Sequence, residues 1–172
     1  VGLMTVYGLP SNFDISVRAL DLLVNVAATD TSKLDWDSLT VDSNAAGIAG
    51  LDDGLNLKVS GNLDLDLGGF VLAAGGFDIT QQSGVSIDDG AEGITGPLAN
   101  ASLLSIEVTD VYLFAGVNGA FTRDGDNIVT GLDTSEAVGF GVSGASLSLK
   151  IAGNQAGTLS WTGVSAHVGL MT

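Results

Sequence analysis

The sequence lacks cysteine and has very little proline or positive charge. Its 172 residues include no cysteine and only two prolines, so a disulfide framework and thiolate chemistry are both excluded. Lysine and arginine together number five against 20 aspartates and glutamates, which gives a formal net charge of −15. That field repels nucleic acid and anionic membrane surfaces and attracts divalent cations. We therefore expect no nucleic-acid partner.

Acidity is combined here with high hydrophobicity. Disordered acidic tails contain few apolar residues, whereas 45% of this chain is hydrophobic, so we expect it to fold. Calcium-rich saline surroundings suit such a surface, because cations screen the mutual repulsion of the carboxylates. The composition therefore favours an extracellular or cell-surface location.

One pentapeptide occurs twice in the sequence. Residues Val1–Thr5 and Val168–Thr172 both read VGLMT, and their offset is 168 − 1 = 167 residues. Self-similarity at a fixed offset is typical of tandem arrays, in which each unit packs against its neighbours. We interpret residues 1–172 as one 167-residue period of such an array. The period is cut within a strand, because the alternation of 159–168 continues into 1–7, so the unit is circularly permuted.

Apolar and polar residues alternate with a period of two along most of the chain, which is typical of strands. Leu63, Leu65 and Leu67 alternate with Asp64 and Asp66, and we expect the two carboxylates to lie on a solvated strand face that also discourages sheet aggregation.

The alternation slips in phase at two points and is punctuated by turns. The slips fall at Asp110-Val111 and between Val17 and Leu20, and such slips usually mark β-bulges. Acidic and glycine-containing turns separate the segments. We predict an all-β fold, an elongated antiparallel β-sandwich or flattened barrel, with a β-solenoid as the alternative.

No catalytic constellation is visible, and we predict that the chain is not an enzyme. Residues 139–144 match the spacing G-x-G-x-x-G, but nucleotide binding needs a helix after that loop, and here the alternation continues as strand. His167 is the only histidine, too few for an ordinary zinc site.

One acidic turn offers oxygen ligands to a metal ion. Asp124, Asp126 and Asn127 are candidate calcium ligands, although an EF-hand needs Gly and Glu at its sixth and twelfth positions, where this sequence has Val129 and Ser135. The turn equally reads as a plain hairpin. We expect no cofactor, and Ca²⁺ is the one candidate ion for this turn.

A long part of the sequence carries no charge. All 20 acids lie between Asp14 and Glu136, and the stretch from Ile151, continued through Phe13 of the next period, has no formal charge. Glycines and alternation argue against a transmembrane helix. A covered strand explains the stretch better, so we predict an assembly seam there and expect Trp161 and Phe140 to be buried. The seam comprises Trp161, Val164, Val168, Leu170, Val1, Leu3 and Val6.

Several segments follow one another in a characteristic order when the sequence is read circularly. They are residues 55–77, 108–121, 124–127, 138–149 and 164–172, followed by 6–10 and Val24-Asn25. This order resembles that of very large tandem-repeat surface proteins of Gram-negative bacteria, which are grouped with giant adhesins. The resemblance implies secretion and surface attachment and brings no catalytic residues.

These observations favour a structural role. We predict a repeat unit of an extracellular fibre, stalk or filament, whose partner is the adjacent repeat or a neighbouring chain. The alternative is a module of a giant adhesin that binds a ligand or glycan through an exposed aromatic side chain, such as that of Trp36, Tyr112 or Trp161.

Overall fold

The computed structural model describes residues 3–5, 12–88 and 97–172 of the chain, and nearly all of its regular structure is strand. No described residue is helical, which confirms the predicted all-β class. The strands are β1 (Leu3–Thr5), β2 (Phe13–Val24), β3 (Thr40–Val41), β4 (Asn44–Ala45), β5 (Leu55–Leu67), β6 (Val71–Ile87), β7 (Leu98–Val117), β8 (Ala120–Arg123), β9 (Val129–Asp133), β10 (Val138–Gly153), β11 (Ser160–His167) and β12 (Leu170–Met171).

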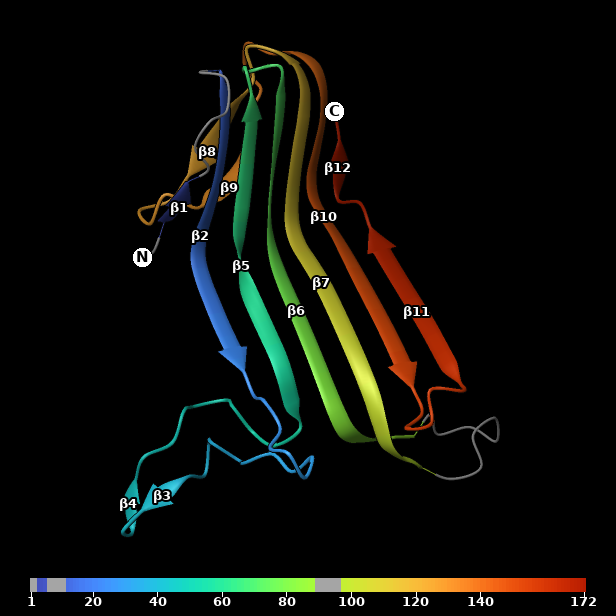
Figure 1. Ribbon diagram of the computed structural model, residues 1–172. Coiled ribbons are helices and arrows are strands. Elements are labelled where there is room, and N and C mark those ends of the chain that lie inside the picture. The colour runs from blue at the N-terminus through green and yellow to red at the C-terminus, as the bar shows by residue number, and fades with distance from the viewer. Residues whose placement is uncertain (1–2, 6–11, 89–96) are drawn as a thin grey trace.

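One large antiparallel sheet dominates the molecule (Figure 1). Its strands follow the order β1-β2-β5-β6-β7-β10-β11, and β12 also pairs with β10. Every neighbouring pair is antiparallel. The sheet is open, with β1 at one edge and β11 and β12 at the other, so it is not a closed, flattened barrel.

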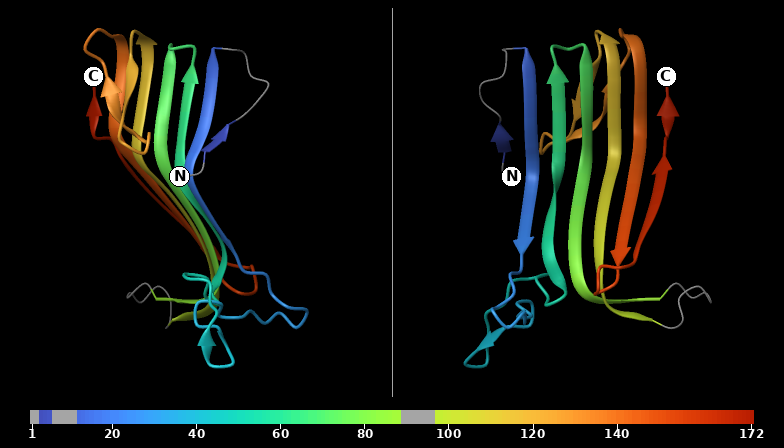
Figure 2. Two further views of the ribbon diagram at one scale, coloured as in Figure 1. Left: turned by 90° about the vertical axis from the view of Figure 1, so that its left-hand side faces the viewer. Right: turned by 45° about the vertical axis from the view of Figure 1, so that its right-hand side comes forward.

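Two short hairpins lie outside the sheet. Strands β3 and β4 pair within the long connection between β2 and β5, at one end of the sheet, and β8 pairs with β9. The β8–β9 hairpin folds back over one face of the sheet at the opposite end (Figures 1 and 2). This hairpin supplies a second layer over part of one face.

The sheet bends part-way along its strands, as the views in Figure 2 show. Irregularities cross the sheet at about this level. Ala19, Asp110 and Gly144 have positive φ values of 49°, 50° and 70°, and the register shifts beside each of them. Both phase slips seen in the sequence are therefore bulges, and each keeps the apolar side chains of its strand on one face.

Strand pairing separates the side chains of the sheet into two faces. The apolar face carries no charged residue on the long strands. It comprises Phe13, Ile15, Val17, Leu22, Val24, Leu57, Val59, Leu63, Leu65, Leu67, Val71, Ala73, Phe77, Ile79, Leu104, Ile106, Val108, Val111, Leu113, Ala115, Val138, Phe140, Val142, Leu147, Leu149, Ile151 and Val164.

The opposite, charged face carries the ionised side chains of the long strands. Its members include Asp14, Arg18, Asp21, Lys58, Asp64, Asp66, Asp78, Glu107 and Lys150. Leu72, Ala74 and Phe114 lie on the same face, beneath the β8–β9 hairpin, and are buried. The most buried large side chains of the molecule therefore lie under the hairpin and not on the apolar face.

Close packing beneath the hairpin depends on glycine. A Cβ atom on Gly119 would come within 2.4 Å of the Phe114 ring, and one on Gly116 would come within 2.2 Å of the Val138 carbonyl oxygen. Only residues without a side chain allow the chain to reverse this close to a phenylalanine ring. These glycines direct the chain from β7 onto the charged face.

Two expectations about burial are wrong. Asp64 is only 6% exposed, because the β8–β9 hairpin covers its part of the charged face, so this carboxylate is not solvated. Phe140 and Trp161 are exposed and not buried, because Phe140 stands on the uncovered apolar face and Trp161 belongs to edge strand β11.

Candidate assembly edges and buried ion cluster

The two copies of the duplicated pentapeptide lie at opposite edges of the same sheet. In the first copy, β1 pairs with β2 and Met4 lies opposite Val17. In the second copy, β12 pairs with β10 and Met171 lies opposite Val142. Each methionine is therefore in register with a valine of the apolar face.

The two copies also run in the same direction. Strands β2, β5, β6, β7 and β10 alternate in direction, so β2 and β10 are parallel to each other, and so are their outer partners β1 and β12. A shift along the sheet that places β12 on β1 consequently preserves both strand direction and face. The strand at one edge therefore has the direction and the register of the strand at the other edge.

Backbone hydrogen bonds show which groups this edge leaves open. The Thr172 N–H donates to the Gly141 carbonyl at 2.9 Å, and the Gly141 N–H donates to the Thr172 carbonyl at 2.7 Å. In an antiparallel ladder, bonded and non-bonded residues alternate. The backbone N–H and C=O of Met171 therefore point away from β10, toward the open side of this edge.

The predicted seam residues are divided between the two edges. Trp161 and Val164 lie on β11, Leu170 lies on β12, and Val168 joins these two strands. All four are exposed. Leu3 lies on β1, at the other edge, whereas Val1 and Val6 fall outside the described residues. The predicted seam residues that the structure describes thus lie at two edges of the sheet instead of on one surface.

A buried ion cluster fixes the β8–β9 hairpin to the sheet. Oδ1 of Asp64 accepts a hydrogen bond from the Ser16 hydroxyl at 2.6 Å, and Oδ2 accepts one from Arg123 Nη2 at 2.5 Å. Arg18 Nε lies 3.6 Å from Oδ1 of the same carboxylate. The Asp64 side chain is 7% exposed. A buried carboxylate with two guanidinium partners and a hydroxyl is well satisfied, so the cluster joins β2, β5 and β8.

A small cavity lies beside this cluster. Its volume is about 190 Å³, and the residues around it include Arg18, Asp64, Asp110, Tyr112 and Ile128. Arg123 also lies over the ring of Phe121, with 5.2 Å from its guanidinium carbon to the ring centroid. The cluster and its surroundings are arranged as a structural anchor for the hairpin.

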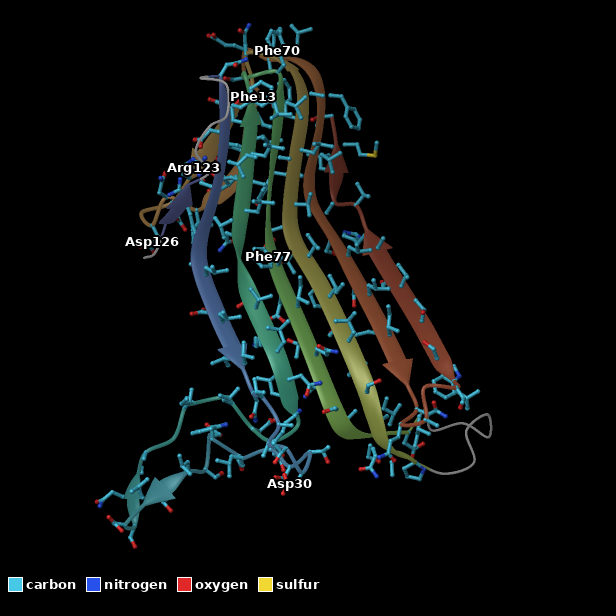
Figure 3. All side chains as sticks on the ribbon, viewed as in Figure 1. Phe13, Asp30, Phe70, Phe77, Arg123 and Asp126 are labelled. Atoms are coloured by element: carbon cyan, nitrogen blue, oxygen red, sulfur yellow. The ribbon has the colours of Figure 1, made fainter. Side chains whose placement is uncertain are left out.

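The candidate calcium residues form the tip of the β8–β9 hairpin, where Figure 3 labels Arg123 and Asp126. Oδ1 of Asp124 accepts from the backbone N–H groups of Asp126 and Ile128 at 3.0 and 2.9 Å. Arg123 Nη1 donates to the Asn127 carbonyl at 3.0 Å. In the amide orientation that satisfies both groups, the Asn127 side-chain oxygen accepts from Arg18. Two guanidinium groups thus lie near this turn.

Within the described residues, no three His, Cys, Asp or Glu side chains are grouped so that they could hold a metal ion. Calcium binding at Asp124, Asp126 and Asn127 stays a prediction.

The three aromatic residues considered for ligand binding lie in separate parts of the molecule. Trp36 belongs to the connection between β2 and β5, where its Nε1 donates to Asn25 at 3.2 Å. Tyr112 borders the cavity beside Asp64, and Trp161 lies on edge strand β11. They form no common platform on which a sugar ring could stack.

The glycine pattern and the histidine considered in the sequence both lie on strands of the sheet. The glycine pattern at 139–144 lies within strand β10, where a Cβ on Gly139 would come within 2.3 Å of the Ala115 carbonyl oxygen and Gly144 supplies the bulge. His167 ends edge strand β11, opposite Ser146.

Comparison with known proteins adds no relative. No family model, curated protein or solved structure matches this chain. Among the described residues, no helix has the length and apolar character needed to cross a membrane.

Proposed function

We propose that the chain is the structural repeat unit of an extracellular bacterial fibre, stalk or filament, and that successive repeats share the VGLMT strand. One observation carries this proposal: the two copies of the pentapeptide lie at opposite edges of one sheet, in the same direction and opposite valines of the same face. A single copy between two repeats pairs with β10 of the first and with β2 of the second. The sheet then continues without a break.

The strand count supports such a continuous sheet. One period supplies β2, β5, β6, β7, β10 and the joined strand β11–β12, which is six strands. Because six is even, each repeat starts in the same strand direction as the one before. Six spacings of about 4.8 Å give an advance of about 29 Å per repeat along the fibre, with the strands running across it.

Sharing a strand also solves the problem of the open edge. Unpaired backbone groups at a sheet edge invite uncontrolled association, and the outward N–H and C=O of Met171 are satisfied by the next repeat. The array becomes stiff without cross-links, which accords with the absence of cysteine.

The acidic surface and the resemblance to repetitive surface proteins support an extracellular, adhesin-like setting for this structural role. The proposed partner is the adjacent repeat. No reacting group or cofactor is needed for such a role, and Ca²⁺ is a possible ligand of the acidic turns.

Electron microscopy of a chain with several tandem copies tests the proposal. We expect straight, unbranched fibres whose length grows by about 29 Å per repeat. Replacing Met171 with proline at each junction removes the N–H that points to the next repeat, while Met171→Ala keeps it. The proline variant should give separate, flexibly linked particles and the alanine variant should give fibres. Separate particles in the unmodified array would contradict strand sharing.

A further inference from the structure

We propose that the apolar face is a docking surface for a second copy of the same sheet, so that two sheets pack face to face. This inference does not depend on strand sharing between repeats, because it concerns the face of the sheet and not its edges. It rests on the exposure, charge and area of the apolar face.

The apolar face is bare in a single chain. Phe13, Leu63, Leu113, Val138 and Phe140 are all at least 36% exposed, although they stand on one continuous side of the sheet. Stable domains bury the apolar side of a sheet against another layer. The β8–β9 hairpin covers the opposite face, as Asp64 and Phe114 show, and no strand among residues 3–5, 12–88 and 97–172 forms a second layer over the apolar face.

The distribution of charge between the two faces favours a second copy that docks through its own apolar face. The chain has a formal net charge of −15, and the long strands place their carboxylates on the charged face. Two copies that approach through their charged faces would oppose like charges. Two copies that approach through their apolar faces keep the ionised residues of the long strands on the two outer faces, away from the contact. Approach through the apolar faces therefore avoids the electrostatic cost.

The area of the apolar face is sufficient for a stable pair. Six strands spaced by about 4.8 Å and about 13 residues long at about 3.3 Å per residue cover about 1,200 Å². Two such faces remove about 2,400 Å² from water, more than the roughly 1,600 Å² of a standard stable interface. A face that is mostly apolar and carries no charged residue on the long strands resembles half of a domain core, as obligate dimer interfaces do.

The apolar face has a hollow and protruding side chains, so that two such faces can interdigitate. A hollow of about 310 Å³ lies at the middle of the sheet, lined by Leu63, Ala73, Gly75, Phe77 and Val111 among others. Larger side chains such as Phe13 and Phe140 stand exposed toward one end, where Figure 3 labels Phe13. Packed sheets interdigitate the side chains of their inner faces in this way.

The test is the oligomeric state of the 172-residue chain in sedimentation equilibrium. The unmodified protein should have twice the 17.3 kDa mass of one chain. Leu63→Lys and Phe140→Lys should raise the dissociation constant by at least about 100-fold, because a lysine would be buried without a partner. Ile48→Lys is the matched control and should leave the dimer intact, since Ile48 is 46% exposed, close to the 44% of Leu63, but lies outside the sheet.

Both lysine variants should remain folded, because their positions are already exposed in the single chain, and circular dichroism checks this. A monomer at all concentrations would overturn the proposal. A dimer that survives Leu63→Lys would also overturn it, because β5 lies inside the sheet and pairing between edges would not involve this residue. Either result leaves strand sharing untouched.

Discussion

The two faces of the sheet use apolar side chains in opposite ways. On the charged face, Phe114 is 1% exposed beneath the β8–β9 hairpin, whereas on the apolar face the neighbouring Phe140 is 43% exposed. The two residues lie on adjacent strands, and each is paired with a residue next to the other in sequence. The difference shows that burial in a single chain follows the cover over a face and not the hydrophobicity of that face.

The largest expected difference between the faces is in the cost of removing a phenylalanine. Phe114→Ala should lower the free energy of unfolding by about 3–5 kcal/mol, because it leaves a cavity under the hairpin. Phe140→Ala should cost about 1–2 kcal/mol in the monomer, because the side chain is already 43% exposed and its removal leaves no enclosed cavity. Urea denaturation at a monomeric concentration measures both, and equal costs would remove the contrast between the faces.

A second contrast lies within the charged face, between covered and uncovered ion pairs. Asp64→Ala should cost about 3 kcal/mol, because it strands the guanidinium groups of Arg18 and Arg123 in a mostly buried site. Asp78 is 36% exposed and pairs with Lys58, which is 44% exposed, so Asp78→Ala should cost at most about 1 kcal/mol. Thermal and urea unfolding of the two variants compare these costs directly. A cost for Asp64→Ala no larger than that for Asp78→Ala would mean that the cluster does not anchor the hairpin.

The bulges allow a smaller, stabilising change. Ala19 has a φ of 49°, a conformation that costs a non-glycine residue about 1–2 kcal/mol. Ala19→Gly should therefore raise the stability by up to about 1 kcal/mol, after the entropy of the extra glycine in the unfolded chain is subtracted. Ala73→Gly on β6 is the control. It should destabilise, because Ala73 is not among the residues with positive φ. If both variants lose stability, the bulge at Ala19 is not strained.

The smallest effect concerns the uncovered end of the charged face. The Lys150 ammonium hydrogen-bonds to Glu107 and holds the pKa of that carboxyl below its usual 4.5, with help from the Ser148 hydroxyl. Because the folded-state pKa is depressed, this contribution to stability is present above pH 4.5 and is lost as the pH falls through the folded-state pKa. Lys150→Gln should raise the pKa of Glu107, as NMR titration of the carboxyl carbon would show. An unchanged pKa would mean that the pair is not formed in solution.

The strands and two bulges could be predicted from the sequence because each produces a pattern among neighbouring residues. Period-two alternation locates β5 and β7, and the phase slips at Asp110 and after Val17 locate two of the bulges. Gly144 leaves a weaker record, since glycine fits both strand interiors and bulges. These features depend on residues close to one another in the chain.

The buried ion cluster could not be predicted from local pattern. Asp64 alternates with leucines as a solvated residue would, and its partners Arg18 and Arg123 lie 46 and 59 residues away in sequence. Only the return of the β8–β9 hairpin over the charged face brings the three together. The scarcity of basic residues could have drawn attention to the two arginines, because only five lysines and arginines are present and both arginines pair with Asp64.

The residues at the two edges of the sheet left a partial signal in the sequence. The charge-free stretch contains β11 and β12, which form one edge of the sheet, but the expected burial of Trp161 and Phe140 is wrong in the single chain. The duplicated pentapeptide predicted an offset, whereas the common direction of its two copies at opposite edges depends on the odd number of strands between them, which are β2, β5, β6, β7 and β10. That number is a property of the topology, which alternation alone does not determine.

Distance measurement between repeats tests strand sharing most directly. A chain of two tandem copies, with Thr130→Cys in each hairpin, carries no other cysteine and can be spin-labelled at those two positions alone. A continuous sheet predicts one narrow distance distribution centred near about 29 Å, six strand spacings apart. A broad distribution, or a mean well beyond the roughly 40 Å diameter of a compact unit, would show independent domains on a linker and would contradict the shared strand.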